Sequence, residues 1–153
     1  MSEIDAKLVM ELDALGLSKE AYRAILLLPL VEVAWVDGEV QPKERDEILS
    51  YAEGNQLLAG DAHRVVEDWL TNRPSDDYFT RGRKVLVRLA HESEGFASDI
   101  GPGQVDDILG YCEVVADSAG GLFGRFFRSS SDEKEAIRKI AVHVARLSSE
   151  YNG

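Results

Sequence analysis

Cysteine and positive charge are both scarce in this chain. The single cysteine, Cys112, excludes an internal disulfide and a zinc site built from several cysteines. Only 17 residues are Lys or Arg against 28 Asp or Glu, which leaves a net charge of −11. Nucleic-acid affinity comes largely from cations at phosphates, so this balance argues against a DNA or RNA partner. The same excess of acid disfavours binding to anionic membrane surfaces.

Long apolar runs and targeting signals are also lacking. The longest apolar stretch, residues 24–36, is interrupted by Pro29 and Glu32. It is shorter than the roughly 20 residues that a membrane-spanning helix needs. The acidic N-terminus has neither the positive start nor the apolar run of a signal peptide. We therefore expect a cytoplasmic protein without a transmembrane segment.

The apolar residues repeat with helical spacing along almost the whole chain, and no segment alternates in the manner of a strand. A chain of 153 residues fits one domain with a real core. We expect an all-α fold, a single compact domain over 1–153 whose core covers about 18–147. It should be a bundle of about seven helices, at about 3–15, 18–36 with a kink at Pro29, 42–53, 61–70, 76–94, 104–117 and from 131.

The fifth expected helix carries the one basic helix face of the chain. Its face is formed by Arg81, Arg83, Lys84 and Arg88, which we expect to be exposed. An enzyme acting on an anionic substrate through this face is one hypothesis. However, the sequence contains no arrangement of a nucleophile with a base, nor a specific pair of carboxylates, that would define a reaction. We therefore expect a protein that is not an enzyme.

Two helix-turn-helix corners in the sequence match each other. In the first, Asp37 ends an apolar helix and Glu44 lies in the first turn of the next; in the second, Asp117 and Glu133 take these places. Apolar residues follow each glutamate at the same three distances. The connectors differ, with seven positions between the acids of the first corner and sixteen in the second. The corners form a pseudo-repeat within one domain.

These four carboxylates allow two interpretations. A glutamate at the third helical position can close a capping box, so capping alone accounts for Glu44 and Glu133. An aspartate at a helix C-terminus faces the negative end of the dipole, which costs about 0.3–1 kcal/mol. Either an Asx-turn or a cation shared with the glutamate would compensate Asp37 and Asp117. Oxygen ligands suit calcium, magnesium or manganese, and nothing indicates an organic cofactor.

The first corner, Ala34-Trp35-Val36-Asp37-Gly38 followed by Glu44, resembles the tellurite-resistance TerB family and TerB-like helical domains. The resemblance covers about 18–147. It implies an all-helical domain with paired acidic clusters that bind a divalent metal, acting in a stress response that includes tellurite resistance. Carried over, the metal ligands would be Asp37, Glu44, Asp117 and Glu133. The second corner departs from the family pattern, since Ser118 replaces glycine and the connector is long.

The long connector, residues 118–130, supports an alternative function. It is rich in glycine and contains Phe123, Arg125, Phe126 and Phe127. These side chains would form an apolar and basic contact surface on an otherwise acidic protein, and the corner carboxylates would then only cap helices. The protein would be a protein–protein interaction module. The alternative, in which these phenylalanines fold back onto the core, agrees with the sequence at least as well. The sequence is also compatible with a homo-oligomer.

Overall fold

A computed structural model describes residues 1–36, 38–40, 42–117 and 130–152, with side chains for 1–36, 38–40, 42, 44–112 and 135–151. The described residues form helices and no strands, which confirms the predicted all-α class. The elements are α1 (Glu3–Ala14), the 3-10 helix η1 (Lys19–Leu27), α2 (Leu28–Ala34), α3 (Pro42–Gly54), α4 (Ala62–Thr71), α5 (Asp76–Glu92), α6 (Pro102–Asp117) and α7 (Ser130–Asn152).

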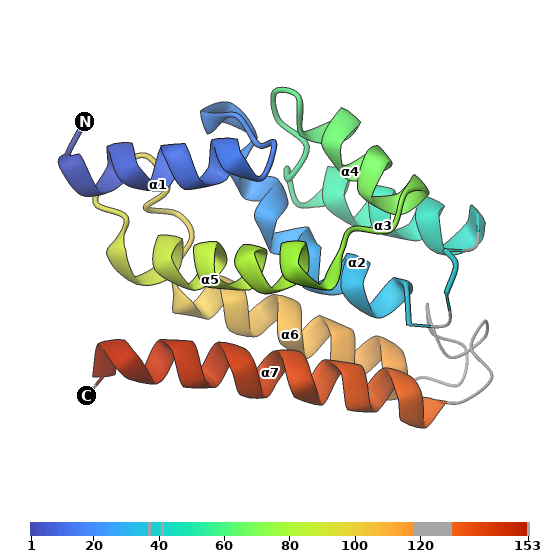
Figure 1. The fold of residues 1–153 in the computed structure, drawn as a ribbon. Coiled ribbons are helices and arrows are strands. Elements are labelled where there is room, and N and C mark those ends of the chain that lie inside the picture. The colour runs from blue at the N-terminus through green and yellow to red at the C-terminus, as the bar shows by residue number, and fades with distance from the viewer. Residues whose placement is uncertain (37, 41, 118–129, 153) are drawn as a thin grey trace.

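Helix α2 lies at the centre of the bundle (Figure 1). It packs against α5, α6 and α7, while α1 covers α5 and α4 covers η1. Six of the seven residues of α2 are buried, as expected for an apolar helix surrounded by others. The two chain ends lie on the same side of the molecule, at the left in Figure 1.

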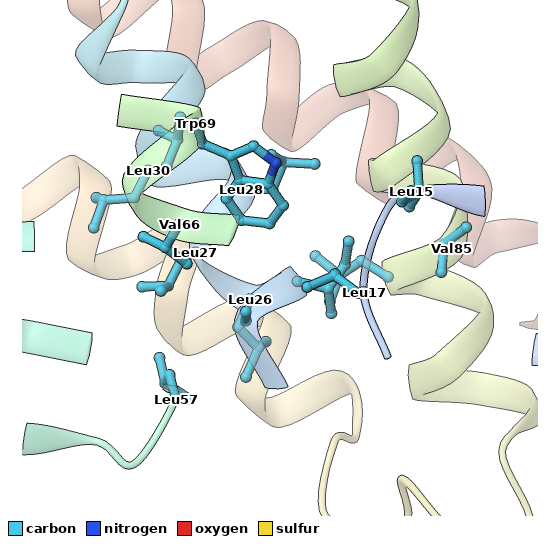
Figure 2. Close-up of a cluster of buried hydrophobic side chains, with 14 of the residues drawn as sticks. Leu15, Leu17, Leu26, Leu27, Leu28, Leu30, Leu57, Val66, Trp69 and Val85 are labelled. Atoms are coloured by element: carbon cyan, nitrogen blue, oxygen red, sulfur yellow. The ribbon is translucent and has the colours of Figure 1, made fainter. Parts of the chain in front are cut away.

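The core is formed mainly by leucines and valines of η1, α2, α4 and α5. Figure 2 shows one part of it, in which side chains from these helices, from the turn after α1 and from the segment between α3 and α4 meet. The labelled members are Leu15, Leu17, Leu26, Leu27, Leu28, Leu30, Leu57, Val66, Trp69 and Val85. Cys112 is buried as well, which confirms its expected packing role.

The second expected helix, 18–36, is not one kinked helix. It consists of the 3-10 helix η1 and the α-helix α2, and the change falls between Leu27 and Leu28, just before Pro29. Pro29 has no N–H to donate to the carbonyl of Ile25, and its ring disfavours an α-helical turn before it. The N–H of Leu28 instead donates to the Ile25 carbonyl, a 3-10 bond.

The helix ends follow the expected local chemistry. The hydroxyls of Ser2 and Ser75 accept hydrogen bonds from the N–H groups three residues later, at 3.1 and 3.0 Å. Gly16 and Gly38 have φ values of 86° and 95°, so each takes the left-handed conformation expected after a helix. These four positions confirm the predicted caps and stops at Ser2, Gly16, Gly38 and Ser75. The boundaries shift by one or two residues in α1 and in α3 to α7, and Gly54, which was expected beyond the end of its helix, is the last residue of α3.

Two members of the expected basic face are not exposed, since Arg88 is only 27% exposed at its side chain and Arg83 points inward. The side chain of Arg83 is only 13% exposed, because it pairs with Glu32 of α2 and donates through Nε to Nδ1 of His143 of α7 at 2.8 Å. The prediction of an exposed Arg83 is therefore wrong. Burial raises the pKa of Glu32, although the nearby charge of Arg83 acts in the opposite direction. Burial and the charge of Arg83 both lower the pKa of His143. Arg83 thus joins α2, α5 and α7.

Asp5 is a buried carboxylate with a structural task. It is 3% exposed and accepts hydrogen bonds from the Glu94 N–H at 2.8 Å and the Ser93 hydroxyl at 3.3 Å. The Glu94 bond, outweighing the opposite effect of burial, lowers the pKa of Asp5. Asp5 therefore ties α1 to the turn that follows α5.

Candidate functional site

The helix ends that border the two predicted corners lie at one end of the bundle, at the right in Figure 1. These are the C-terminal ends of α2 and α6 and the N-terminal ends of α3 and α7. The packing of α2 against α6 and α7, and of α6 against α7, holds three of these helices together. We call this region the corner end. It brings the borders of both predicted corners to the same part of the molecule.

The chain leaves α2 in a tight turn. The N–H of Val36 donates to the Val33 carbonyl at 3.1 Å, and the N–H of Gly38 donates to the Trp35 carbonyl at 3.0 Å. The indole of Trp35 anchors this turn, because its Nε1 donates to the Trp69 carbonyl of α4 at 2.9 Å. Asp37, the first predicted ligand, lies outside the described residues.

Glu44 is the one predicted ligand whose side chain is described. It is the third residue of α3 and is fully buried, with 0% exposure. A negative charge in the first helical turn is favoured by the helix dipole. Burial of a carboxylate is otherwise costly, so its surroundings must compensate the charge. Glu44 is therefore an interior group of the corner end and not part of a solvated acidic face.

The second corner is described only by its backbone. Asp117 is the last residue of α6, as predicted, and Glu133 is the fourth residue of α7. Glu133 therefore lies one position further into its helix than Glu44, because α7 begins at Ser130 and not at Ser131. The side chains of both acids lie outside the description, and so do the predicted contact residues Phe123, Arg125, Phe126 and Phe127.

The described side chains do not by themselves assemble a metal centre. Among them, no three His, Cys, Asp or Glu residues are grouped closely enough to hold an ion. Glu44 is the sole member of the predicted set within that search. Its carboxylate matches the oxygen donors that calcium, magnesium and manganese prefer. The complete ligand set therefore stays a prediction.

A second candidate site, which the sequence did not predict as a cavity, lies between α1 and α5. It is an open groove of about 290 Å³. Its lining consists of Glu11, Ala14, Leu15, Arg81, Lys84, Val85 and Arg88, and we call it the α1–α5 groove. The sequence signal was present, since Arg81, Lys84, Val85 and Arg88 share one helix face. The opposing wall from α1 could not be deduced from that spacing.

Arg88 is the third basic residue in the lining of the groove. It pairs with Glu11 of α1 and, through Nε at 3.0 Å, with Glu92 of α5. Tyr151 of α7 donates its hydroxyl to the same Glu92 carboxylate. Burial alone would raise the pKa of Glu92, but the bonds from Tyr151 and Arg88 outweigh it and lower this pKa. Arg88 is therefore committed to joining α1, α5 and α7.

Comparisons with protein-family models, curated proteins and solved structures find no match to this chain. Within the described ranges, no helix combines the length and apolar character of a membrane span.

Proposed function

We propose that this protein is a non-enzymatic, TerB-like domain that binds a divalent cation at the corner end, in a stress response of the tellurite-resistance kind. One observation carries the proposal. The helix ends bordering both acidic corners meet at one end of the bundle, and a fully buried carboxylate, Glu44, lies there. Carboxylates that converge can hold a cation, whereas dispersed ones only solvate a surface.

The residues that would hold the cation are Asp37, Glu44, Asp117 and Glu133. A bound divalent cation would supply positive charge next to two aspartates that each follow or end a helix. That charge would offset their unfavourable position at the negative ends of the helix dipoles. The protein's contribution is the rigid placement of these helix ends, which the packing of α2 on α6 and α7 supports.

Isothermal titration calorimetry with calcium, magnesium and manganese tests the proposal. We expect at least one of these ions to bind the wild-type protein and binding to be lost in Asp37→Asn/Asp117→Asn. The matched control is Asp106→Asn/Asp107→Asn, which removes the same charge from exposed positions in the first half of α6. Circular dichroism verifies that both double variants stay helical.

Two results would contradict the proposal. Either no ion binds the wild-type protein, or the corner variant and the control variant bind equally well. The corner carboxylates would then act only as helix caps. The interaction-module hypothesis would take over, and its own test is loss of a captured protein partner in Phe126→Ser with retention in the corner variant.

A further inference from the structure

We propose that the α1–α5 groove binds a small amphipathic carboxylate, with its charged group at Arg81 and Lys84 and its hydrocarbon part on the floor of the groove. This inference concerns a different face from the corner end and does not depend on the proposed cation site.

Two cations of the groove are available to a ligand. Lys84 is exposed and makes no ion pair with any described residue. Arg81 is 53% exposed at its side chain, and its one ion pair with a described residue is a long one of 3.9 Å to Asp77, which is itself 81% exposed. A pair of this kind contributes little to stability. Arg81 and Lys84 can therefore turn to an incoming anion at small cost, whereas Arg88 is held by Glu11 and Glu92.

Glu11 does not cancel this positive charge. Its carboxylate is paired with Arg88, and its Oε2 atom is buried with no hydrogen-bond partner among the described residues. Glu11 consequently depends on Arg88 for charge compensation. Arg88 also pairs with Glu92, on which the cation Lys7 acts as well, so Arg88 and Lys7 together offset Glu11 and Glu92. The positive charge presented to a ligand then comes from Arg81 and Lys84.

The floor of the groove is apolar. Ala14 and Leu15 at the end of α1 face Val85 of α5. Met10, four residues before Ala14 and therefore on the same side of α1, leaves 72% of its side chain exposed. A hydrocarbon chain leaving the cations would cover this surface and remove apolar area from water.

Size and charge together favour a small molecule over a macromolecule. A volume of about 290 Å³ is near the lower limit of small-molecule pockets. The seven lining residues are far fewer than the roughly 20–30 residues that each partner contributes to a protein interface. A chain with a net charge of −11 repels anions in general. Arg81 and Lys84, which lie beside the apolar floor, therefore form a local exception that attracts anions. A carboxylate with a short apolar body is complementary to both parts of the groove.

Nuclear magnetic resonance titration of the full chain with sodium octanoate, with a chelator present, tests this inference. We expect shifts of the Ala14, Leu15 and Val85 amides. Affinity should rise about fourfold per methylene from butyrate to octanoate, as expected for each buried CH₂. Octanol, which lacks the charge, and acetate, which lacks the chain, should bind at least tenfold more weakly than octanoate.

Variants assign the contacts. Lys84→Gln and Arg81→Gln should each weaken octanoate binding by about fivefold, the upper size of one partly exposed ion pair. Ala14→Gln should weaken it by filling the floor without changing the charge. Arg64→Gln is the control, because Arg64 is an exposed arginine of α4 outside the groove lining, with 73% of its side chain accessible against 53% for Arg81. It should leave the affinity unchanged.

Three outcomes would overturn the inference. Octanol binding as tightly as octanoate would remove the role of the charge. Equal loss in Arg64→Gln and Lys84→Gln would reduce the effect to overall charge. Tighter binding of an acidic peptide such as hexaglutamate would make the groove a protein-docking surface.

Discussion

Gly82, in the middle of α5, marks a close approach of this helix to α2. A Cβ atom added at Gly82 would lie 2.1 Å from Cδ2 of Leu28 and 3.8 Å from Cδ1 of Ile25. The first distance is far inside any normal contact between carbon atoms. Leu28 is 2% exposed and Ile25 is 0% exposed, so neither side chain has free space into which it can move. We predict that Gly82→Ala destabilises the protein.

Two opposing contributions set the magnitude. Alanine in a helix interior is favoured over glycine by about 1 kcal/mol. Overpacking a dense core costs about 1–3 kcal/mol. Because the overlap at Leu28 is severe, the packing cost should prevail and leave a net loss of about 1–2 kcal/mol in the free energy of unfolding. Gly110→Ala in α6 is the matched control, since nothing lies within 4 Å of its added Cβ. It should gain up to about 1 kcal/mol.

Urea denaturation followed by circular dichroism measures both variants. The difference in unfolding free energy between Gly82→Ala and Gly110→Ala isolates the steric cost from helix propensity. Leu28→Ala supplies a further test, because it removes the atom that the new Cβ would meet. In the double variant, Gly82→Ala should cost less than it does alone. Equal stabilisation by both glycine substitutions would refute the close packing of α5 on α2.

Three further predictions concern titrating groups. The pKa of His143 is lowered from its ordinary value of 6.5, because protonation would place, in a partly buried position, a second cation beside Arg83. The free energy of unfolding should therefore decrease as the pH falls below 6.5. Urea denaturation at several pH values should show that His143→Gln loses this dependence. The pKa of Tyr151 is raised to about 12 by burial and by Glu92. The phenol's contribution to the free energy of unfolding should therefore be fully present below pH 10.0 and be lost as the pH rises through about 12. The absorbance difference between wild type and Tyr151→Phe should show that midpoint, and a midpoint near 10.0 would contradict the contact. The pKa of Asp5 is lowered, so its contribution to the free energy of unfolding should be lost as the pH falls through 3.8 and below. In Asp5→Asn, the free energy of unfolding should depend less steeply on pH in this acid range than in the wild type.

Local patterns explain which parts of the fold were predictable. The caps at Ser2 and Ser75 and the left-handed Gly38 depend on a few neighbouring residues, and they were predicted correctly. A kink at Pro29 was expected, but the division into a 3-10 helix and a separate α-helix was not. A proline predicts an interruption, whereas the hydrogen-bond pattern of the whole segment depends on its packing.

Long-range contacts explain the errors and omissions. Arg83 shares a helical spacing with exposed basic residues, yet its partners Glu32 and His143 lie 51 and 60 positions away in the chain. The α1–α5 groove depends on Arg88 meeting Glu11, 77 positions away. Spacing along one helix cannot show which helix will cover it. At the corner end, the four candidate ligands were predicted from the sequence repeat. Among them only Glu44 has a described side chain, and the repeat did not predict that this side chain would be buried.

Paramagnetic broadening by manganese tests the central claim most directly, because Mn²⁺ reports where it binds without any mutation. Substoichiometric Mn²⁺ would be added to the isotope-labelled protein, and backbone amide signals followed. We expect broadening centred on Trp35, Gly38 and Glu44 and on the amides where α6 ends and α7 begins. Calcium or magnesium should reverse it by competition. Broadening spread over exposed acids such as Glu3 and Asp106, or no broadening at all, would contradict a cation site at the corner end.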